Sequence, residues 1–185
     1  MKTRIYIQPR MKTLLLFVSL LGLLGLGQGS VSASAKLLPE FNNNNPAQWF
    51  NSKPLKRADL KGKVVLLDVW TYGCWNCYRS FPWLNELEAS LSSENFLVIG
   101  IHTPEFGHEK DASNVLKKIK EFKLHHPVMM DNDFSYWKAL GNRYWPTFYI
   151  IDKQGRIRSV HIGETHAGDQ NARRIEAEIR QLLAE

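Results

Sequence analysis

The feature that most restricts the fold is an apolar segment that leads directly into an amphipathic helix. Residues 64–70, Val-Val-Leu-Leu-Asp-Val-Trp, are almost continuously apolar and follow Lys61-Gly62-Lys63, a pattern typical of a strand buried on both faces. Between residues 75 and 91 the apolar positions recur every three or four residues, at Phe81, Leu84, Leu87 and Leu91, as an amphipathic helix requires. A strand buried on both faces needs other elements above and below it, which favours a layered α/β domain.

The rest of the sequence alternates between strand and helix patterns. Strand patterns cover residues 96–101, 127–130, 147–151 and 157–162, and helix patterns cover residues 111–123, 134–140 and 169–183. Strands separated by helices pair in parallel, whereas the last two strands, joined by Asp152-Lys-Gln-Gly155, form an antiparallel hairpin. We therefore predict an α/β fold with a mixed sheet.

The first 35 residues have the pattern of a secretory signal peptide. Basic residues precede an apolar run from Leu14 to Leu26, and small residues follow it as far as Ala35. The run is shorter than the ~20 residues that a membrane-spanning helix needs. We predict a signal peptide over residues 1–35, cleaved after Ala35 or after Ala33, with an uncleaved membrane anchor as the alternative. Met-Lys-Thr occurs at residue 1 and again at residue 11, so either methionine is a candidate start.

We predict that residues 36–53 form an N-terminal extension and residues 54–185 the domain. The net charge of +6 does not indicate a nucleic-acid partner, because four of the 24 basic residues lie in the leader, at Lys2, Arg4, Arg10 and Lys12. The leader has no acidic residue, so the rest of the chain has 20 basic and 18 acidic residues, a balance of +2. No basic stretch in it is interleaved with base-stacking aromatic residues.

Both cysteines, Cys74 and Cys77, lie at the junction between the first buried strand and its helix. A thiol there is close to the unpaired N–H groups and the positive end of the helix dipole, which favour the thiolate and lower the pKa from ~8.5. Cys77 lies one turn further in, where it can attack a mixed disulfide formed on Cys74. The spacing predicts a redox pair with Cys74 as the nucleophile and Cys77 as the resolving thiol.

Other roles for this cysteine pair fit the sequence less well. A zinc site needs four ligands, but the chain has no second cysteine pair and its histidines are scattered. Haem attachment requires a histidine after the second cysteine, where Tyr78 stands. A structural disulfide is an alternative, although so small a loop restricts the unfolded chain little. We expect no metal and no cofactor, since a nucleotide-binding glycine-rich loop is also missing from the sequence.

Asp68 stands six residues before Cys74 in an otherwise apolar strand. Apolar surroundings raise the pKa of a carboxyl group, which could then take a proton from the resolving thiol. We therefore predict a catalytic role for Asp68. The alternative is a partly exposed strand residue that makes only structural hydrogen bonds.

The segment from Lys63 to Cys77, followed by Phe81-Pro82, resembles the active-site segment of the thioredoxin-like fold, in the secreted branch that includes TlpA. The sequence is more similar to the thioredoxin-like domain of DipZ-type proteins. This similarity is carried, in order, by Trp70-Thr-Tyr72, Cys74-x-Asn76-Cys77, His102-Thr-Pro-Glu-Phe106, Glu109-Lys-Asp111, Asp131-Asn-Asp133 and Asn142-Arg-Tyr-Trp-Pro146. The resemblance covers residues 63 to about 165 and implies a three-layer sandwich in which helices flank a mixed sheet.

The resemblance also implies which residues meet the substrate. Trp145-Pro146-Thr147 is similar to a loop in which a cis-proline lies opposite the redox pair and exposes backbone to an extended substrate. The alternative is an ordinary trans proline that opens the following strand. The expected substrate contacts are therefore Trp145 and Pro146 in this loop, together with Trp75 and Asn76 between the cysteines.

We predict an extracytoplasmic thiol-disulfide oxidoreductase, periplasmic or secreted, that acts on protein thiols and disulfides. The expected electron partner is a membrane or periplasmic redox protein, and no nucleic acid is expected. One alternative is a thiol peroxidase, because Thr71-x-x-Cys74 matches part of the peroxiredoxin pattern, although Leu67 stands where that pattern has proline. The other is a binding module with an inert disulfide. The uncharged Trp75-Asn76 pair leaves both directions of electron flow open.

Overall fold

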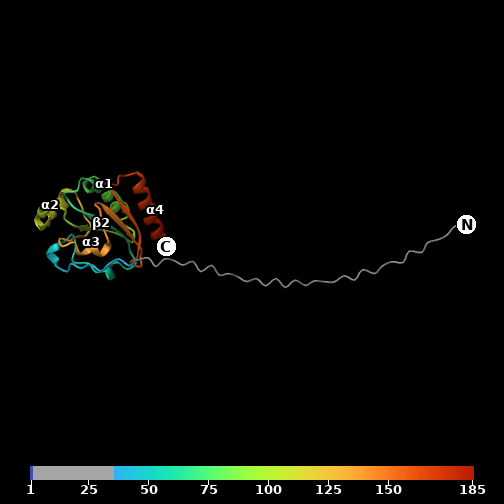
Figure 1. Ribbon diagram of the computed structural model, residues 1–185, viewed down its shortest axis with the longest axis horizontal. Helices are drawn as coiled ribbons and strands as arrows, with labels where there is room; N and C mark the ends of the chain where they lie inside the picture. The colour runs from blue at the N-terminus through green and yellow to red at the C-terminus, as the bar shows by residue number, and fades with distance from the viewer. Residues whose placement is uncertain (2–35) are drawn as a thin grey trace. The chain divides into compact units, whose positions relative to one another are not determined.

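A six-stranded mixed sheet forms the centre of the protein (Figure 1). The computed structural model describes Met1 and residues 36–185, so the predicted signal peptide lies outside the described residues apart from Met1. The strands lie in the order β1-β4-β3-β2-β5-β6. Their bounds are β1 Trp49–Phe50, β2 Val64–Trp70, β3 Phe96–His102, β4 Val128–Met130, β5 Thr147–Ile151 and β6 Ile157–Ile162.

The pairing of the strands confirms the predicted mixed sheet. β2 and β3 are parallel, as are β3 and β4, whereas β5 is antiparallel to both β2 and β6. The two-residue β1 adds an antiparallel edge next to β4. Every residue of β2 is buried, as its continuous apolar sequence predicts for a central strand.

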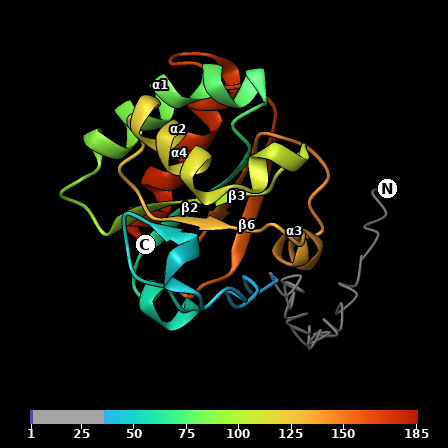
Figure 2. The ribbon, with the colours of Figure 1, turned by 90° about the vertical axis from the view of Figure 1, so that its left-hand side faces the viewer.

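Helices cover both faces of the sheet and make the predicted three-layer sandwich. α1 (Trp75–Ser90), α2 (Ala112–Glu121) and α4 (Gln170–Ala184) lie on one face, and α3 (Ser135–Leu140) lies on the other (Figure 2). Three short 3₁₀ helices, η1 Pro46–Gln48, η2 Arg57–Leu60 and η3 Gly107–Lys110, complete the elements. None of the helices in the described part of the chain is both long and apolar enough to cross a bilayer.

Alternate residues of β2 contribute to two separate cores. Val64, Leu66 and Trp70 pack under α1, α2 and α4, whereas Val65 and Leu67 pack against α3. This division follows from the two-residue period of a strand, whose side chains point to opposite faces in turn. Residues 36–185 lie within one compact unit that contains both cores.

The segment before η2 is part of the second core. Leu38, Phe41 and Trp49 are buried against α3, where the Phe41 ring stacks on Tyr136 at 5.4 Å. At its start, the N–H of Leu38 donates to the carbonyl of Gly155. Residues that we predict to be an N-terminal extension therefore bury apolar side chains within the domain.

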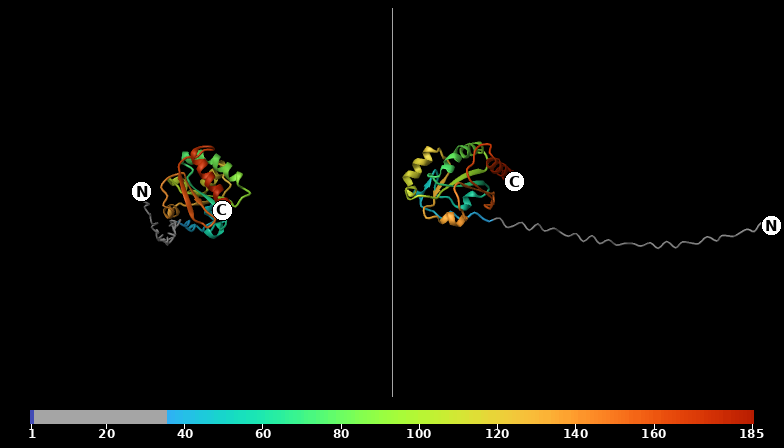
Figure 3. Two further views of the ribbon diagram at one scale, coloured as in Figure 1. Left: turned by 90° about the vertical axis from the view of Figure 1, so that its right-hand side faces the viewer. Right: turned by 45° about the horizontal axis from the view of Figure 1, so that its top comes forward.

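α1 continues through Pro82, which lies inside the helix. Proline removes one backbone hydrogen bond in a helix interior, but the buried side chains on either side of Pro82 hold α1 on the sheet. One of them, Trp83, donates its indole N–H to Glu176 of α4 at 2.9 Å. α1 and α4 therefore lie side by side over the sheet (Figure 3).

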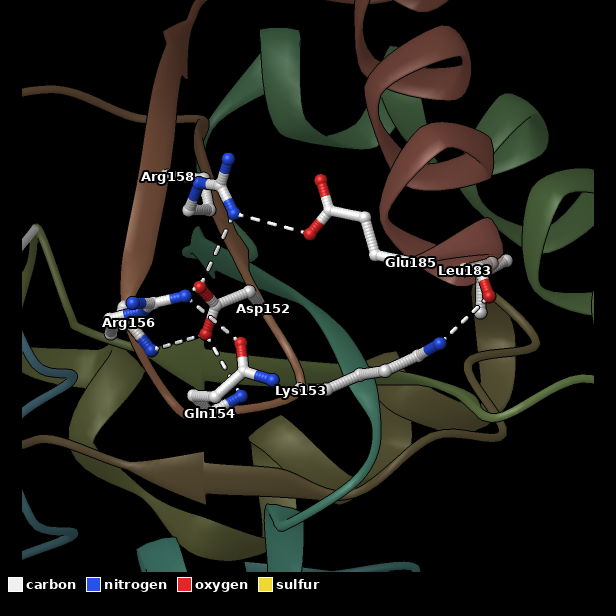
Figure 4. Close-up of polar contacts among 7 residues, drawn as sticks. All are labelled: Asp152, Lys153, Gln154, Arg156, Arg158, Leu183 and Glu185. Atoms are coloured by element: carbon white, nitrogen blue, oxygen red, sulfur yellow. Dashed lines mark hydrogen bonds and ion pairs between the residues drawn. The ribbon is translucent and has the colours of Figure 1, made fainter. Parts of the chain in front are cut away.

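A buried carboxylate organises the hairpin between β5 and β6. Asp152 is 1% exposed and accepts hydrogen bonds from the backbone N–H groups of Gln154 and Arg156 and from the guanidinium of Arg156 (Figure 4). Arg158 lies between Asp152 and Glu185, at 3.4 and 3.5 Å from their carboxylates. These contacts connect the hairpin tip with the end of α4.

Candidate active site

Three loops meet at the end of the sheet where the C-terminus of β2 lies. β3 runs parallel to β2 with His102 opposite Trp70, so the loop after β3 starts beside the loop that leads to Cys74. β5 is antiparallel to β2, with Thr147 opposite Val69, which places Pro146 at the same end of the sheet. Residues far apart in the sequence, 71–77, 103–110 and 144–147, are therefore brought together.

Cys74 is the N-cap residue of α1 and is partly exposed. Its Sγ accepts a hydrogen bond from the backbone N–H of Cys77 at 3.3 Å. Hydrogen bonds from the side chain and backbone of Cys77 lower the pKa of Cys74 to about 7, against the opposing effect of its burial. Cys74 therefore lies at the helix N-terminus where the sequence predicts it, and about half of a thiol with this pKa is ionised at neutral pH.

Cys77 and Asp68 lie beneath Cys74 and are both buried. Burial raises the pKa of Cys77 well above its ordinary value, and the charges of Cys74 and Asp68 raise it further. Burial also raises the pKa of Asp68, as predicted, with a smaller contribution from the Cys74 charge. At 1% exposure, Asp68 is not the partly exposed strand residue of the alternative interpretation.

The Trp145–Pro146 peptide bond is cis, as the resemblance implies. Trp145 is half-buried, packs on Trp137 at 4.4 Å, and donates its indole N–H to the carbonyl of Thr103 at 3.1 Å. The ring of Pro146 is buried, whereas Trp75 and Asn76 are exposed. The four predicted substrate contacts therefore differ in the exposure of their side chains, which is high for Trp75 and Asn76 and low for Pro146.

Exposed aromatic side chains surround the cysteines. Trp75, Tyr78, Phe106 and Tyr144 are 45 to 66% exposed, which is unusual for residues of this size. A shallow pocket of about 200 Å³ beside Cys74 is lined by Tyr72, Gly73, Cys74, Trp75, Tyr78, Lys118, Glu121 and Phe122. An apolar surface of this kind beside a reactive thiol suits contact with a polypeptide.

Glu109 is a site residue that the sequence did not assign to a role. It is fully buried, and its carboxylate accepts hydrogen bonds from the Thr71 hydroxyl at 2.7 Å and from the Gly73 N–H at 2.8 Å. The N–H groups of Glu105 and Phe106 donate to it at 2.6 and 3.0 Å. Although burial opposes ionisation, these four hydrogen bonds together hold the pKa of Glu109 below its ordinary value.

The one indication of Glu109 in the sequence was its presence in the Glu109-Lys-Asp111 motif. Its hydrogen-bond donors Thr71 and Gly73 lie 38 and 36 residues away in the sequence. Glu109 connects the loop before Cys74 with the loop that carries Phe106. A Cβ atom on Gly73 would overlap the Glu109 carboxylate, which explains the glycine at this position.

His102 lies behind the cysteine loop and is fully buried between Trp70 and Tyr72. Burial lowers its pKa to about 4, against the opposing effect of the Glu109 charge, so the ring is neutral at pH 7. In the described part of the chain, no three His, Cys, Asp or Glu side chains gather as a metal site would require.

The chain is similar to curated proteins over about three quarters of its length. It is 39% identical over 137 residues to SUPPRESSOR OF QUENCHING 1 of Arabidopsis thaliana and 39% identical over 138 residues to DipZ of Mycobacterium tuberculosis. These matches cover 74% and 73% of this chain but only 13% and 19% of those proteins. Thiol-disulfide oxidoreductase YkuV of Bacillus subtilis is 24% identical over 80% of this chain and 95% of its own.

Solved structures and a family model agree with the observed architecture. The thioredoxin-like superfamily protein SPOA0173 has a TM-score of 0.70 and 28% identity, covering 82% of this chain and 98% of that one. A thiol-disulfide isomerase of Corynebacterium glutamicum has a TM-score of 0.68 at 24% identity, with the same coverage. The Redoxin family model matches residues 33–178. The chain therefore belongs to the Redoxin family and has a thioredoxin-like fold.

Proposed function

We propose that the protein is an extracytoplasmic thiol-disulfide oxidoreductase that exchanges dithiol and disulfide with protein substrates. The observation that carries this proposal is the arrangement of the two thiols: Cys74 caps α1 at the protein surface with a pKa of about 7, and Cys77 is buried directly beneath it with a raised pKa. The first thiol is about half ionised at neutral pH and partly exposed, and the second is buried until a partner has reacted.

In the reducing direction, the Cys74 thiolate attacks one sulfur of a substrate disulfide and the other substrate sulfur leaves as a thiolate. Asp68 takes the proton of Cys77, and the new Cys77 thiolate attacks Cys74 in the mixed disulfide. The second substrate sulfur then leaves and takes up a proton. Two electrons pass from the cysteine pair to the substrate, and the same steps in reverse oxidise a substrate dithiol.

The surface around the cysteines, formed by the loops 71–77, 103–110 and 144–147, offers contacts for an extended polypeptide. We assign the exposed Trp75 and Asn76 to substrate contact through their side chains. The buried Pro146 and half-buried Trp145 contribute through the backbone of the cis loop and one face of the indole. Electrons come from, or go to, another redox protein in the membrane or the periplasm.

The location follows from the predicted leader over residues 1–35, with the mature protein beginning at Lys36 or Ser34. Mass spectrometry of the protein isolated from its own host tests this directly. A mature N-terminus at either residue supports export and cleavage, whereas an intact Met1 or Met11 terminus in a membrane fraction supports the anchored alternative.

Thiol peroxidase activity is less compatible with the site. A peroxidase threonine must present its hydroxyl to the peroxide beside the cysteine, but the hydroxyl of Thr71 is fully buried and donates to Glu109. A binding module with an inert disulfide would need no ionised thiol, so it does not explain the lowered pKa of Cys74. Disulfide exchange is therefore the function that the geometry supports best.

The test is reduction of insulin disulfides by the domain of residues 36–185 with dithiothreitol as the electron source. We expect turnover that disappears in Cys74→Ser, and a trapped mixed disulfide in Cys77→Ser. Hydrogen peroxide consumption in place of insulin reduction would support the peroxidase, and inactivity in both assays would support the binding module. The reduction potential then gives the direction, since values near −270 mV indicate a reductant and values near −120 mV an oxidant.

A further inference from the structure

Gly100 lies beside Asp68 in the sheet, and the side chains of Trp70, Val128 and His126 lie around it. Asp68 and Gly100 are register partners in the parallel pair of β2 and β3. A Cβ atom on Gly100 would lie 2.8 Å from Trp70 Nε1, 3.1 Å from Val128 Cγ2 and 3.4 Å from His126 Nε2. Because Asp68 and Trp70 are two residues apart on one strand, their side chains lie on the same face, under α1.

Three of the polar atoms in this region have no hydrogen-bond partner among the described residues. They are Asp68 Oδ1, Trp70 Nε1 and His126 Nε2, and none of the three residues is more than 1% exposed. An unpartnered polar atom in a protein interior costs about 1 to 3 kcal/mol. Such atoms are rare in native structures, so two of them close to Gly100 and a third on its register partner Asp68 call for a functional explanation.

The other nitrogen of His126 is directed toward the surface. His126 Nδ1 lies 3.3 Å from Glu88 Oε2 on α1, and the Glu88 side chain is 25% exposed. A carboxylate only accepts hydrogen bonds, so in the neutral imidazole this contact places the proton on Nδ1 and leaves the lone pair on Nε2, near Gly100. His126 therefore spans the distance between the region beside Asp68 and a carboxylate in contact with solvent.

The proposed reaction needs such a connection, because Asp68 takes a proton from Cys77 in every cycle and must release it. The titratable groups near Asp68 on the α1 side are Cys74 and Cys77, the reacting thiols themselves. β5 presents the apolar Phe148 in register with Asp68. On the β3 side the titratable groups are His102, which packs on Trp70 and whose pKa burial lowers to about 4, and His126, which lies near the missing side chain of Gly100 and also reaches Glu88.

We propose that His126 and Glu88 form the route by which Asp68 exchanges its proton with solvent. This inference rests on the proposed disulfide exchange. The protonated carboxyl of Asp68 gives its proton through the space beside Gly100 to His126 Nε2, and the imidazolium releases the Nδ1 proton to Glu88 or to water. One proton passes from Cys77 to solvent, and no electrons move in this step. His126 acts through Asp68 and touches no substrate atom.

The matched test compares His126→Gln with His125→Gln, because His125 is the exposed neighbour of the buried His126. The resolving step is followed by stopped-flow tryptophan fluorescence between pH 5.5 and 8.5, as the reduced domain reacts with a disulfide-bonded peptide. General acid-base groups contribute 10² to 10⁴ in rate, and we expect about a tenfold slower step in His126→Gln for the loss of one group of a relay. His125→Gln should match the wild type.

Two further measurements separate a proton route from a structural role. The reduction potential should be equal in the wild type and in His126→Gln, because a proton route changes rates and leaves the equilibrium between dithiol and disulfide unchanged. Asp68→Asn combined with His126→Gln should be no slower than Asp68→Asn alone, because the amide that replaces the carboxyl group has no proton to pass on. Additive losses in the double variant, or equal rates in the two histidine variants, would overturn the proposal.

If His126→Gln does not fold, Glu88→Gln on the surface of α1 provides the same comparison. We expect about a threefold slower step for it with the same non-additivity toward Asp68→Asn. Wild-type rates at every pH would also overturn the proposal. A wild-type protein that reduces no peptide disulfide at all would instead contradict the proposed function.

Discussion

Replacement of Glu109 by glutamine should destabilise the domain strongly although it changes one atom. The carboxylate accepts hydrogen bonds from the Thr71 hydroxyl and from the N–H groups of Gly73, Glu105 and Phe106. A glutamine whose one acceptor oxygen replaces Oε2 keeps three of these donors, but its NH₂ group then faces the Gly73 N–H, which donates to Oε1. Two unpaired donors, the Gly73 N–H and the amide N–H that faces it, cost about 1 to 3 kcal/mol each; less the cost of burying a charge, the net loss is about 3 kcal/mol.

The assay is thermal unfolding of the reduced domain, followed by circular dichroism from pH 3 to pH 8. For a domain of this size about 3 kcal/mol corresponds to a Tm lower by about 6 to 12 °C. The pKa of Glu109 is lowered by folding, so its contribution is fully present above the unfolded-state pKa of ~4.3 and is lost as the pH falls through the folded-state value. The difference between wild type and Glu109→Gln should therefore shrink below about pH 4.

The exposed Glu86 on α1 provides the control, and Glu86→Gln should stay within about 0.5 kcal/mol of the wild type. Gly73→Ala should reproduce the loss by a different route, because its Cβ would displace the Glu109 carboxylate from its donors. A Tm for Glu109→Gln within about 3 °C of the wild type at pH 7 would refute the view that this carboxylate fixes the cysteine loop.

Three further predictions concern the thiols and the carboxyl group beneath them. Asp68→Asn should stabilise the protein at pH 8. Folding raises the pKa of Asp68, so stability is lost as the pH rises from the unfolded-state value of ~3.9 through the higher folded-state value. Denaturant titrations at pH 5 and pH 8 measure the gain in the free energy of unfolding, and a gain no larger at pH 8 than at pH 5 would contradict this. Cys77→Ala should raise the pKa of Cys74 above about 7 by removing its main hydrogen-bond donor, measured as the pH dependence of iodoacetamide alkylation, and an unchanged midpoint would exclude that donor as the cause. Glu105→Gln should lower the same midpoint, because the Glu105 charge opposes ionisation of Cys74; Glu94→Gln serves as its control.

The sheet and its helices could be predicted from the sequence because their signals are local. A continuous apolar run specified β2, and apolar residues three or four apart specified α1. The residues that cap α2 and α4, Asp111 and Asp169, accept hydrogen bonds from N–H groups two or three positions ahead. Such contacts depend only on neighbours in the chain.

The parts that sequence reasoning missed depend on distant partners. Leu38, Phe41 and Trp49 follow no helical or strand period, and their burial depends on the surface that α3 provides. Glu109 looked like one more acidic residue of a loop, because its donors at Thr71 and Gly73 become neighbours only when β2 and β3 pair. The cysteine pair was visible in the sequence, but the carboxylate that holds its loop was not.

The way the chain enters the domain has a consequence for any leader that is retained. The carbonyl of Lys36 accepts a hydrogen bond from Ile157 at 2.8 Å, at the tip of the β5–β6 hairpin. Pro146 and the cysteines lie at the opposite end of β5, roughly 17 Å away for a strand of five residues. A membrane tether attached through Lys36 would thus hold the domain by the pole remote from Cys74.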